Sequence, residues 1–139
     1  MQTSQLRAEY SSKHSQLLAC QAEHITLEEE LEFVRQKKTE LQTLKNDVIQ
    51  NRVNALTVNS SIDFLEWVGS NYATFAETYV DRLCHEKYTN YINDIDANLD
   101  ALVDEERRLE NKLLENDGLI GKLRQGLNWL SAEIEKITN

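Results

Sequence analysis

Isoleucine and leucine recur at alternating intervals of three and four residues along the second half of this 139-residue chain. Such a repeat keeps one apolar stripe of an α-helix facing a partner helix, and it is the seam of a coiled coil. Just before the repeat the heptad slips between Leu83 and Tyr88, where we expect a register adjustment. Twelve of the fourteen seam positions are apolar: Ile92, Ile95, Leu99, Leu102, Glu106, Leu109, Leu113, Asn116, Ile120, Leu123, Leu127, Leu130, Ile134 and Ile137.

A less regular repeat of the same kind follows the first half of the chain. Eight of its eleven positions are apolar or Cys: Leu6, Tyr10, Lys13, Leu17, Cys20, His24, Leu27, Leu31, Val34, Lys38 and Leu41. The chain contains no proline, a residue that costs about 3 kcal/mol inside a helix. The two seams therefore predict an all-α fold, a long antiparallel two-helix hairpin of coiled-coil type in which each half covers the apolar stripe of the other.

The bend of this hairpin is expected near the middle of the chain. The segment NALTVNSSIDF, residues 54–64, combines asparagine, serine and β-branched residues that favour caps and turns over helix interior. We predict a single hairpin domain over residues 1–139, with a first helix at about 3–56, a bend at about 57–70 and a second helix at about 71–137.

Two kinds of residue interrupt the second seam. Glu106 and Asn116 are polar at seam positions, where a polar side chain can fix the register and the number of helices at a cost in stability. The alternative for Asn116 is that the helix loosens nearby and the side chain reaches water. Gly118, Gly121 and Gly126 are expected to kink or loosen the last helix.

The charge balance and the cysteines restrict the classes of function. With 24 acidic and 15 basic residues the chain has a formal net charge of −9, which opposes binding to nucleic acid and to anionic membranes. No run of eighteen apolar residues occurs, and the opening MQTSQLRAEY lacks the apolar core of a secretory signal, so we expect a cytoplasmic protein without membrane insertion. Cys20 and Cys84 stand far apart, which predicts two buried thiols in a reducing compartment.

No residue pattern points to catalysis or to metal binding. Cys20 and His24 lie one turn apart, but two ligands are too few for a structural zinc site. Cys84 and His85 are neighbours and point about 100° apart on a helix, which argues against a thiolate–imidazole pair. Carboxylate runs such as LEEELE are typical of a solvated face. We expect no enzymatic activity, no catalytic or metal site and no cofactor.

Several apolar residues lie just outside the seams. A two-helix hairpin covers one side of each helix, and such a chain is usually part of a larger helical assembly. We expect these residues to contact a second hairpin in a four-helix arrangement: Leu18, Ile25, Ile49, Val103 and Leu114.

Aromatic residues and a glycine gather in the stretch LEWVGSNYATFAE, residues 65–77. Gly69 allows the backbone to turn, and Trp67 can place its indole across the end of the hairpin. Phe75 and Tyr79 lie one turn apart and share a helix face. The residues predicted to hold the bend or to pack and bind protein near it are Phe64, Trp67, Gly69, Tyr72, Phe75 and Tyr79. The apolar residues of the second seam are also predicted to pack against or bind partner helices: Ile92, Ile95, Leu99, Leu102, Leu109, Leu113, Ile120, Leu123, Leu127, Leu130 and Ile134.

Trp67-Val68-Gly69 between two long helices resembles the WXG signature of the small helical hairpins exported by type VII secretion systems. The chain is similar over nearly its whole length to the YwqH-like family of Firmicutes, which has a Leu-rich first helix, the W-x-G bend, a segment like YINDIDANLDAL and a closing ladder like LIGKLRQGLNWLSAEIEKI. The resemblance implies a chaperone-like partner that binds the helical N-terminal domain of an LXG-type toxin, together with a second small hairpin, for secretion.

One element of the export signal of WXG proteins is missing from the sequence. In that signal an aromatic residue is followed four positions later by an acid, and none of the five Tyr and three Phe fits. Trp129 with Glu133 comes nearest, so the resemblance implies that a partner chain supplies the signal for export without a cleaved signal peptide. The alternative function is a self-associating coiled-coil scaffold unrelated to secretion, in which Trp67 and Gly69 form a packed turn. A cryptic metalloenzyme would require bound zinc or iron.

Overall fold

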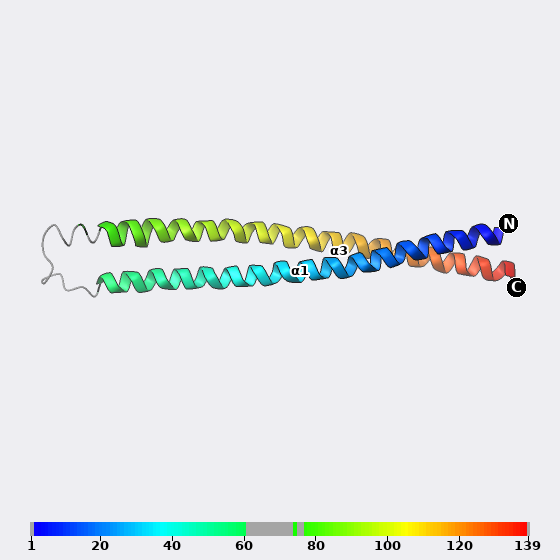
Figure 1. Cartoon of the computed structure of the whole chain (residues 1–139), viewed down its shortest axis with the longest axis horizontal. Helices are drawn as coiled ribbons and strands as arrows, with labels where there is room; N and C mark the ends of the chain where they lie inside the picture. Colours follow the sequence, from blue (N-terminus) through cyan, green and yellow to red (C-terminus); the bar gives the residue numbers. More distant parts are fainter. Residues whose placement is uncertain (1, 61–73, 75–76, 139) are drawn as a thin grey trace. The chain divides into compact units, whose positions relative to one another are not determined.

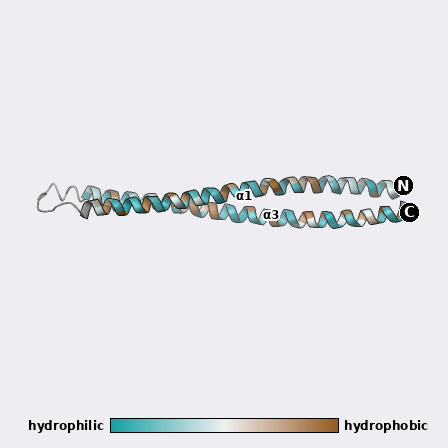
Figure 2. Cartoon of the chain, turned by 90° about the horizontal axis from the view of Figure 1, so that it is seen from below, coloured by the Kyte–Doolittle hydropathy of each residue, from teal (hydrophilic) through white to brown (hydrophobic). Residues whose placement is uncertain are grey.

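The computed structural model describes residues 2–60, 74 and 77–138. It contains helix α1 (Gln2–Ser60), the π-helix η1 (Glu77–Lys87) and helix α3 (Tyr88–Thr138), as Figure 1 shows. Helix α1 packs antiparallel against the second half of the chain, so the fold is the all-α helical hairpin that the two seams predict. Hydrophobic residues recur along both helices between hydrophilic ones (Figure 2).

Helix α1 continues beyond its predicted end. It ends at Ser60 rather than near residue 56, because the polar and β-branched residues there are accommodated within the helix. Thr57, for example, donates its hydroxyl hydrogen bond to the carbonyl oxygen of Val53, one turn earlier, at 2.9 Å. The rest of the predicted bend lies outside the described residues, and so do the residues predicted to hold it: Phe64, Trp67, Gly69, Tyr72 and Phe75.

The first of two compact units, which we call the terminal unit, comprises in its described part residues 2–34 of α1 and residues 105–138 of α3. Its core contains Leu17, Ile120, Leu123 and Leu127, and Cys20 packs against it. Leu109 and Leu130 are each 1% exposed, and complete burial of a leucine contributes about 1.5–3 kcal/mol. The other buried residues of this unit are Leu27, Leu31 and Val34. These positions follow the predicted seams.

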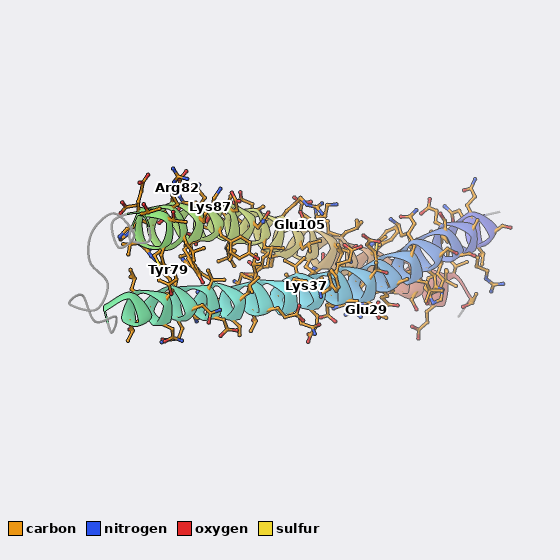
Figure 3. The ribbon with its side chains drawn as sticks, turned by 60° about the vertical axis from the view of Figure 1, so that its left-hand side comes forward. Glu29, Lys37, Tyr79, Arg82, Lys87 and Glu105 are labelled. Carbon is orange, nitrogen blue, oxygen red and sulfur yellow. The ribbon has the colours of Figure 1, made fainter. Side chains whose placement is uncertain are left out.

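The second unit, residues 35–104, has a smaller core. Val48, Cys84 and Ile95 are its buried apolar residues in the described part. An ion pair joins its helices, with Lys45 Nζ 2.6 Å from Asp96 Oδ1. Tyr79 points toward α1, whereas Arg82 and Lys87 lie on the outer side (Figure 3). The second unit therefore combines a thin apolar core with polar contacts across the helix pair.

The π-helix η1 precedes α3 without a break in the helical backbone. A π-helix forms i→i+5 hydrogen bonds and has more residues per turn than an α-helix, so side chains shift around the axis relative to an α-helical register. The change from π- to α-helix falls between Lys87 and Tyr88. That point lies in the interval where the slip of the heptad predicts a register adjustment. Within η1, Cys84 is completely buried and its neighbour Leu83 is 39% exposed.

The glycines of α3 do not interrupt it. The helix continues through Gly118, Gly121 and Gly126 to Thr138, so the predicted loosening is wrong. Gly126 faces α1, because a Cβ atom there would lie 3.4 Å from Cδ of Lys13, an ordinary van der Waals distance. Around Gly118 and Gly121, no atom of the described residues beyond the adjoining backbone of α3 lies within 4 Å of such a Cβ.

Candidate helix-binding site

A polar layer interrupts the apolar core of the terminal unit. Asn116 of α3 donates a hydrogen bond from Nδ2 to the backbone carbonyl oxygen of Cys20 in α1, at 2.8 Å. The carbonyl oxygen of Cys20 also accepts the helical hydrogen bond from the backbone N–H of His24, and the Asn116 amide donates to the second lone pair of that oxygen. Asn116 is half-buried, so the structure favours the role in register over the alternative in which the side chain reaches water.

His24 lies in the same layer and contacts two carboxylates. Its Nδ1 is 2.8 Å from Oδ1 of Asp117 on α3, and its Nε2 is 3.0 Å from Oε1 of Glu28, one turn further along α1. Only the doubly protonated ring can donate to both oxygens. The side chain of His24 is 32% exposed and that of Asp117 is 51% exposed, so water weakens this pair.

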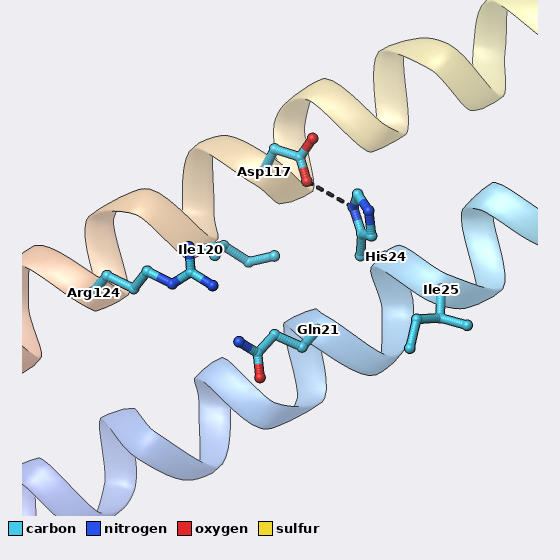
Figure 4. A pocket seen from close by; sticks show the side chains of 6 residues that line it. All are labelled: Gln21, His24, Ile25, Asp117, Ile120 and Arg124. Carbon is cyan, nitrogen blue, oxygen red and sulfur yellow. Dashed lines mark hydrogen bonds and ion pairs between the residues drawn. The ribbon is translucent and has the colours of Figure 1, made fainter.

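A groove of about 380 Å³ opens beside the polar layer. Figure 4 shows its walls, formed by Gln21, His24 and Ile25 of α1 and by Asp117, Ile120 and Arg124 of α3. Ile120 is 9% exposed at the base, and Ile25 is 57% exposed at the rim. Arg124 has no ion-pair or hydrogen-bond partner among residues 2–60, 74 and 77–138. The groove thus combines apolar side chains with an uncompensated guanidinium group.

Two further exposed apolar side chains lie on the side of the groove. Leu18 is one turn before Gln21, and Leu114 is one turn before Asp117, so each shares a helix face with a groove residue. Leu18 is 54% exposed and Leu114 is 70% exposed. With Ile25 they are the three terminal-unit residues that we expect to contact a second hairpin. The corresponding residues of the second unit, Ile49 and Val103, are each 40% exposed.

A second depression of the terminal unit is electrostatically different. It is lined by Phe33, Val34 and Leu109 together with Glu105 and Arg108, among other residues. Arg108 donates hydrogen bonds to both carboxylate oxygens of Glu105, and this contact lowers the pKa of the Glu105 carboxyl. The positive charge of Arg108 is therefore already paired with a carboxylate of the same chain, whereas that of Arg124 is not.

The second unit contains a buried thiol. Cys84 is 0% exposed, and this desolvation raises the pKa of its thiol, although the nearby positive charge of Arg52 acts in the opposite direction. Desolvation also raises the pKa of the Tyr79 hydroxyl, with contributions from the charges of Cys84 and Tyr88. Nη2 of Arg52 lies 3.4 Å from Nδ1 of His85. The thiol is protonated near neutral pH and is a poor nucleophile in that form.

The structure places the predicted packing candidates of the second helix between the two helices of each unit. Six are buried: Ile95, Leu109, Ile120, Leu123, Leu127 and Leu130. Others are half-buried: Tyr79, Ile92, Leu99, Leu102, Leu113 and Ile134. Two residues at the ends of the predicted seams, Tyr10 and Ile137, are exposed at 37% and 45%. The seams are thus occupied within the hairpin, and the surface left for another protein lies beside them.

Sequence reasoning missed the pair of His24 with Asp117 and the exposed position of Arg124. The sequence shows that His24 occupies a seam position. It does not show which residue His24 contacts, because that partner depends on how the two helices are aligned. Comparisons with protein-family models, with curated proteins and with solved structures find no match to this chain. In the described part of the chain, no helix is long and apolar enough to cross a membrane.

Proposed function

We propose that this chain is a non-enzymatic, chaperone-like helical partner that binds the helical N-terminal domain of an LXG-type toxin for type VII secretion. The observation that carries the proposal is the exposure of Leu18, Ile25 and Leu114 around a groove, on helices whose seams are already filled. An exposed apolar patch with a polar rim is typical of a protein-interaction site.

A partner helix would cover the apolar surface that the two-helix hairpin leaves exposed. Each helix of a two-helix hairpin has one covered side, and a further helix laid into the groove would remove the three apolar side chains from water. Leu18 and Ile25 are already about half covered, so covering the rest of one such side chain is worth roughly 1 kcal/mol before the costs of association. A second hairpin, contributed by the toxin or by another small protein, would complete a four-helix arrangement.

The cellular setting of the proposal rests on the resemblance of the W-x-G bend and the closing ladder to the YwqH-like family. In this setting the chain meets the toxin in the cytoplasm and accompanies or presents it to the secretion machine without a cleaved signal peptide. Because the aromatic–acid pattern of the export signal is missing from the sequence, the partner supplies that signal. The net charge of −9 disfavours self-association.

Co-purification tests the proposal directly. The full chain is expressed alone and with the helical N-terminal domain of an LXG toxin, and both samples are examined by size-exclusion chromatography and thermal melting. We expect a stable complex whose melting temperature exceeds that of the chain alone. A tight homodimer that forms no complex, and whose melting is unchanged by the toxin domain, would instead support the self-associating scaffold.

A further inference from the structure

Helix α1 has a regular seam in the second unit. Its buried or half-buried positions recur at alternating intervals of four and three residues: Leu41, Lys45, Val48, Arg52 and Ala55. The residues between these positions are exposed. This spacing is that of a coiled-coil helix. Helix α1 therefore keeps one winding through residue 55, whereas the opposing helix changes its winding at η1.

The covered side chains of the opposing helix recur at a different interval. Counting back from Ile92, buried or half-buried side chains occur at Tyr88, Cys84 and Val80, and Tyr79 beside Val80 is half-buried as well. Three successive intervals of four residues exceed the mean of about 3.5 in an α-helical seam. The i→i+5 hydrogen bonds of a π-helix provide the extra residues in each turn. The π-winding of η1 thus brings its apolar side chains and its thiol to α1.

An ion pair on the outer side of η1 has the same spacing. Nη2 of Arg82 lies 3.4 Å from Oε1 of Glu77, five residues earlier. Residues five apart point about 140° away from each other on an α-helix, but they lie above one another on a π-helix. The two side chains are 66% and 63% exposed, so the pair stabilises the segment little. It is a consequence of the π-winding rather than its cause.

An α-helical winding of the same residues would bring a different set to α1. If the alternation of four and three continues back from Ile92, the seam positions are Tyr88, His85, Asp81 and Thr78. His85, Asp81 and Thr78 are exposed in the structure. Two sets of side chains, one mostly apolar and one polar, thus compete for the same stretch of α1, and the winding decides which of them is covered.

The seam of α1 can accommodate either set. Arg52 is half-buried there; its Nε is buried without a hydrogen-bond partner in the described part of the chain, and its Nη2 lies 3.4 Å from Nδ1 of His85. The π-winding removes Cys84 and Val80 from water. The α-winding would move the imidazole and the carboxylate of Asp81 into the seam that contains this guanidinium group, and would form the i→i+4 hydrogen bonds of the far commoner α-helix. Each winding therefore has a gain that the other lacks.

We propose that residues 77–87 are a conformational device with two windings: the π-helix of the structure, with Cys84 inside, and an α-helix with Asp81 and His85 inside. This inference does not rest on the proposed function. Rewinding turns the side chains of η1 about the helix axis, by an angle that grows toward Glu77, while α1 and α3 keep their seams. It moves Cys84 from the seam to its flank. A π-segment within a longer helix is frequent at functional sites.

Two substitutions that make the α-winding seam apolar test the proposal. The Cys20→Ser chain, in which Cys84 is the remaining thiol, carries Asp81→Leu and His85→Leu. Scalar couplings across backbone hydrogen bonds, measured by NMR, identify the acceptor of each N–H. We expect i→i+5 acceptors over residues 77–87 in the parent Cys20→Ser chain and i→i+4 acceptors in the leucine variant. Cys84 of the leucine variant should react with iodoacetamide at least about tenfold faster.

Glu86→Leu with Asn90→Leu in the same parent chain is the matched control. These two residues are also exposed and four apart, but neither winding places them on the seam. The hydrogen-bond acceptors should stay the same, and the Cys84 rate should change less than about twofold. Val80→Asn tests the other winding. Val80 is half-buried in the π-helix and off the seam in the α-helix, so this change disfavours the π-winding alone and should also give i→i+4 acceptors and a faster reaction.

The couplings distinguish rewinding from unfolding, because an unfolded segment has a reactive thiol but no hydrogen-bond couplings. Conversion to i→i+4 acceptors in the leucine variant or in Val80→Asn, with the control unchanged, supports the inference. Unfolding of the segment in both variants would overturn it, and so would i→i+5 acceptors with a slow thiol in both. Acceptors of the i→i+4 kind in the parent chain, or conversion by the control substitutions, would overturn it as well.

Discussion

The side-chain amide of Asn116 donates a hydrogen bond to the backbone carbonyl oxygen of Cys20, 96 residues away, at 2.8 Å. A leucine side chain can slide along an apolar seam at little cost, whereas the Asn116 amide must give up its contact with the Cys20 carbonyl before it reaches another acceptor. The bond therefore ties one turn of α3 to one turn of α1. Neighbouring Asp117 contacts His24 one turn further along α1, so two successive residues of α3 define the same register.

This relationship predicts that Asn116→Leu makes the protein more stable but less specific in alignment. The carbonyl of Cys20 retains its helical bond, and leucine adds apolar burial at a half-buried seam position. We expect the free energy of unfolding in urea to rise by about 1 kcal/mol. Asn111→Leu, at an exposed position of the same helix, is the matched control and should leave the free energy of unfolding unchanged. A less stable Asn116→Leu protein would show that the hydrogen bond outweighs the apolar gain.

The pair of His24 with Asp117 should contribute little energy despite its short distance. Both side chains are partly exposed, and exposed ion pairs are worth about 0.2–1 kcal/mol. A double-mutant cycle with His24→Gln and Asp117→Asn is expected to give a coupling energy in that range. The coupling should decrease between low salt and 1 M NaCl, because ions screen the pair. A value that does not change with salt would mean that the contact is not electrostatic.

The repeat of apolar residues was sufficient to predict the fold, and burial shows why. Leu109 and Leu130 are seam positions and are almost completely buried. A repeat of about 3.5 residues keeps the seam residues on one face of the helix, and this face packs against the antiparallel helix. The end of α1 was less predictable. Thr57 lies in a segment whose composition is typical of turns. Its hydroxyl group, however, donates a hydrogen bond to the preceding turn of the helix, so the helix can continue through this residue.

The candidate site was predictable only in part. Leu18, Ile25 and Leu114 stand out in the sequence because they lie beside seam positions, and all three are exposed. The groove itself depends on which residues of the two helices lie level with each other. That alignment is set by Asn116 on Cys20 and by Lys13 over Gly126, contacts between residues about a hundred positions apart. Periodicity within one helix carries no information on such pairs.

The glycines of α3 give a third prediction. Gly118→Ala and Gly121→Ala should each stabilise the protein by about 1 kcal/mol, since alanine is the better residue inside a helix and the space around both positions is open. Gly126→Ala should gain at least as much, because its Cβ would make an ordinary van der Waals contact with the stem of Lys13 at 3.4 Å. Thermal and urea unfolding of the three variants measures the difference. A smaller gain at Gly126 would show that the lysine stem has to move aside at a cost.

The buried thiol of Cys84 predicts a decline in stability at alkaline pH. Because burial raises its pKa above the ordinary value of 9.0, the folded protein holds this proton more tightly than the unfolded chain does. Stability is complete below pH 9 and falls as the pH rises toward the folded pKa, since the unfolded thiol ionises first. Tyr79, whose pKa is also raised, adds a change of the same sign at higher pH.

Urea unfolding at pH 7 and at pH 10 checks this expectation. The wild-type chain should lose more stability over this interval than Cys84→Ala, which lacks the thiol and keeps Tyr79. Cys20→Ser is the matched control, because it removes the half-buried thiol of the terminal unit and leaves Cys84 in place. In that variant a thiol reagent should react with Cys84 only as fast as the surrounding helices open. Rapid reaction of Cys84 in the folded chain at pH 7 would contradict its burial between α1 and η1.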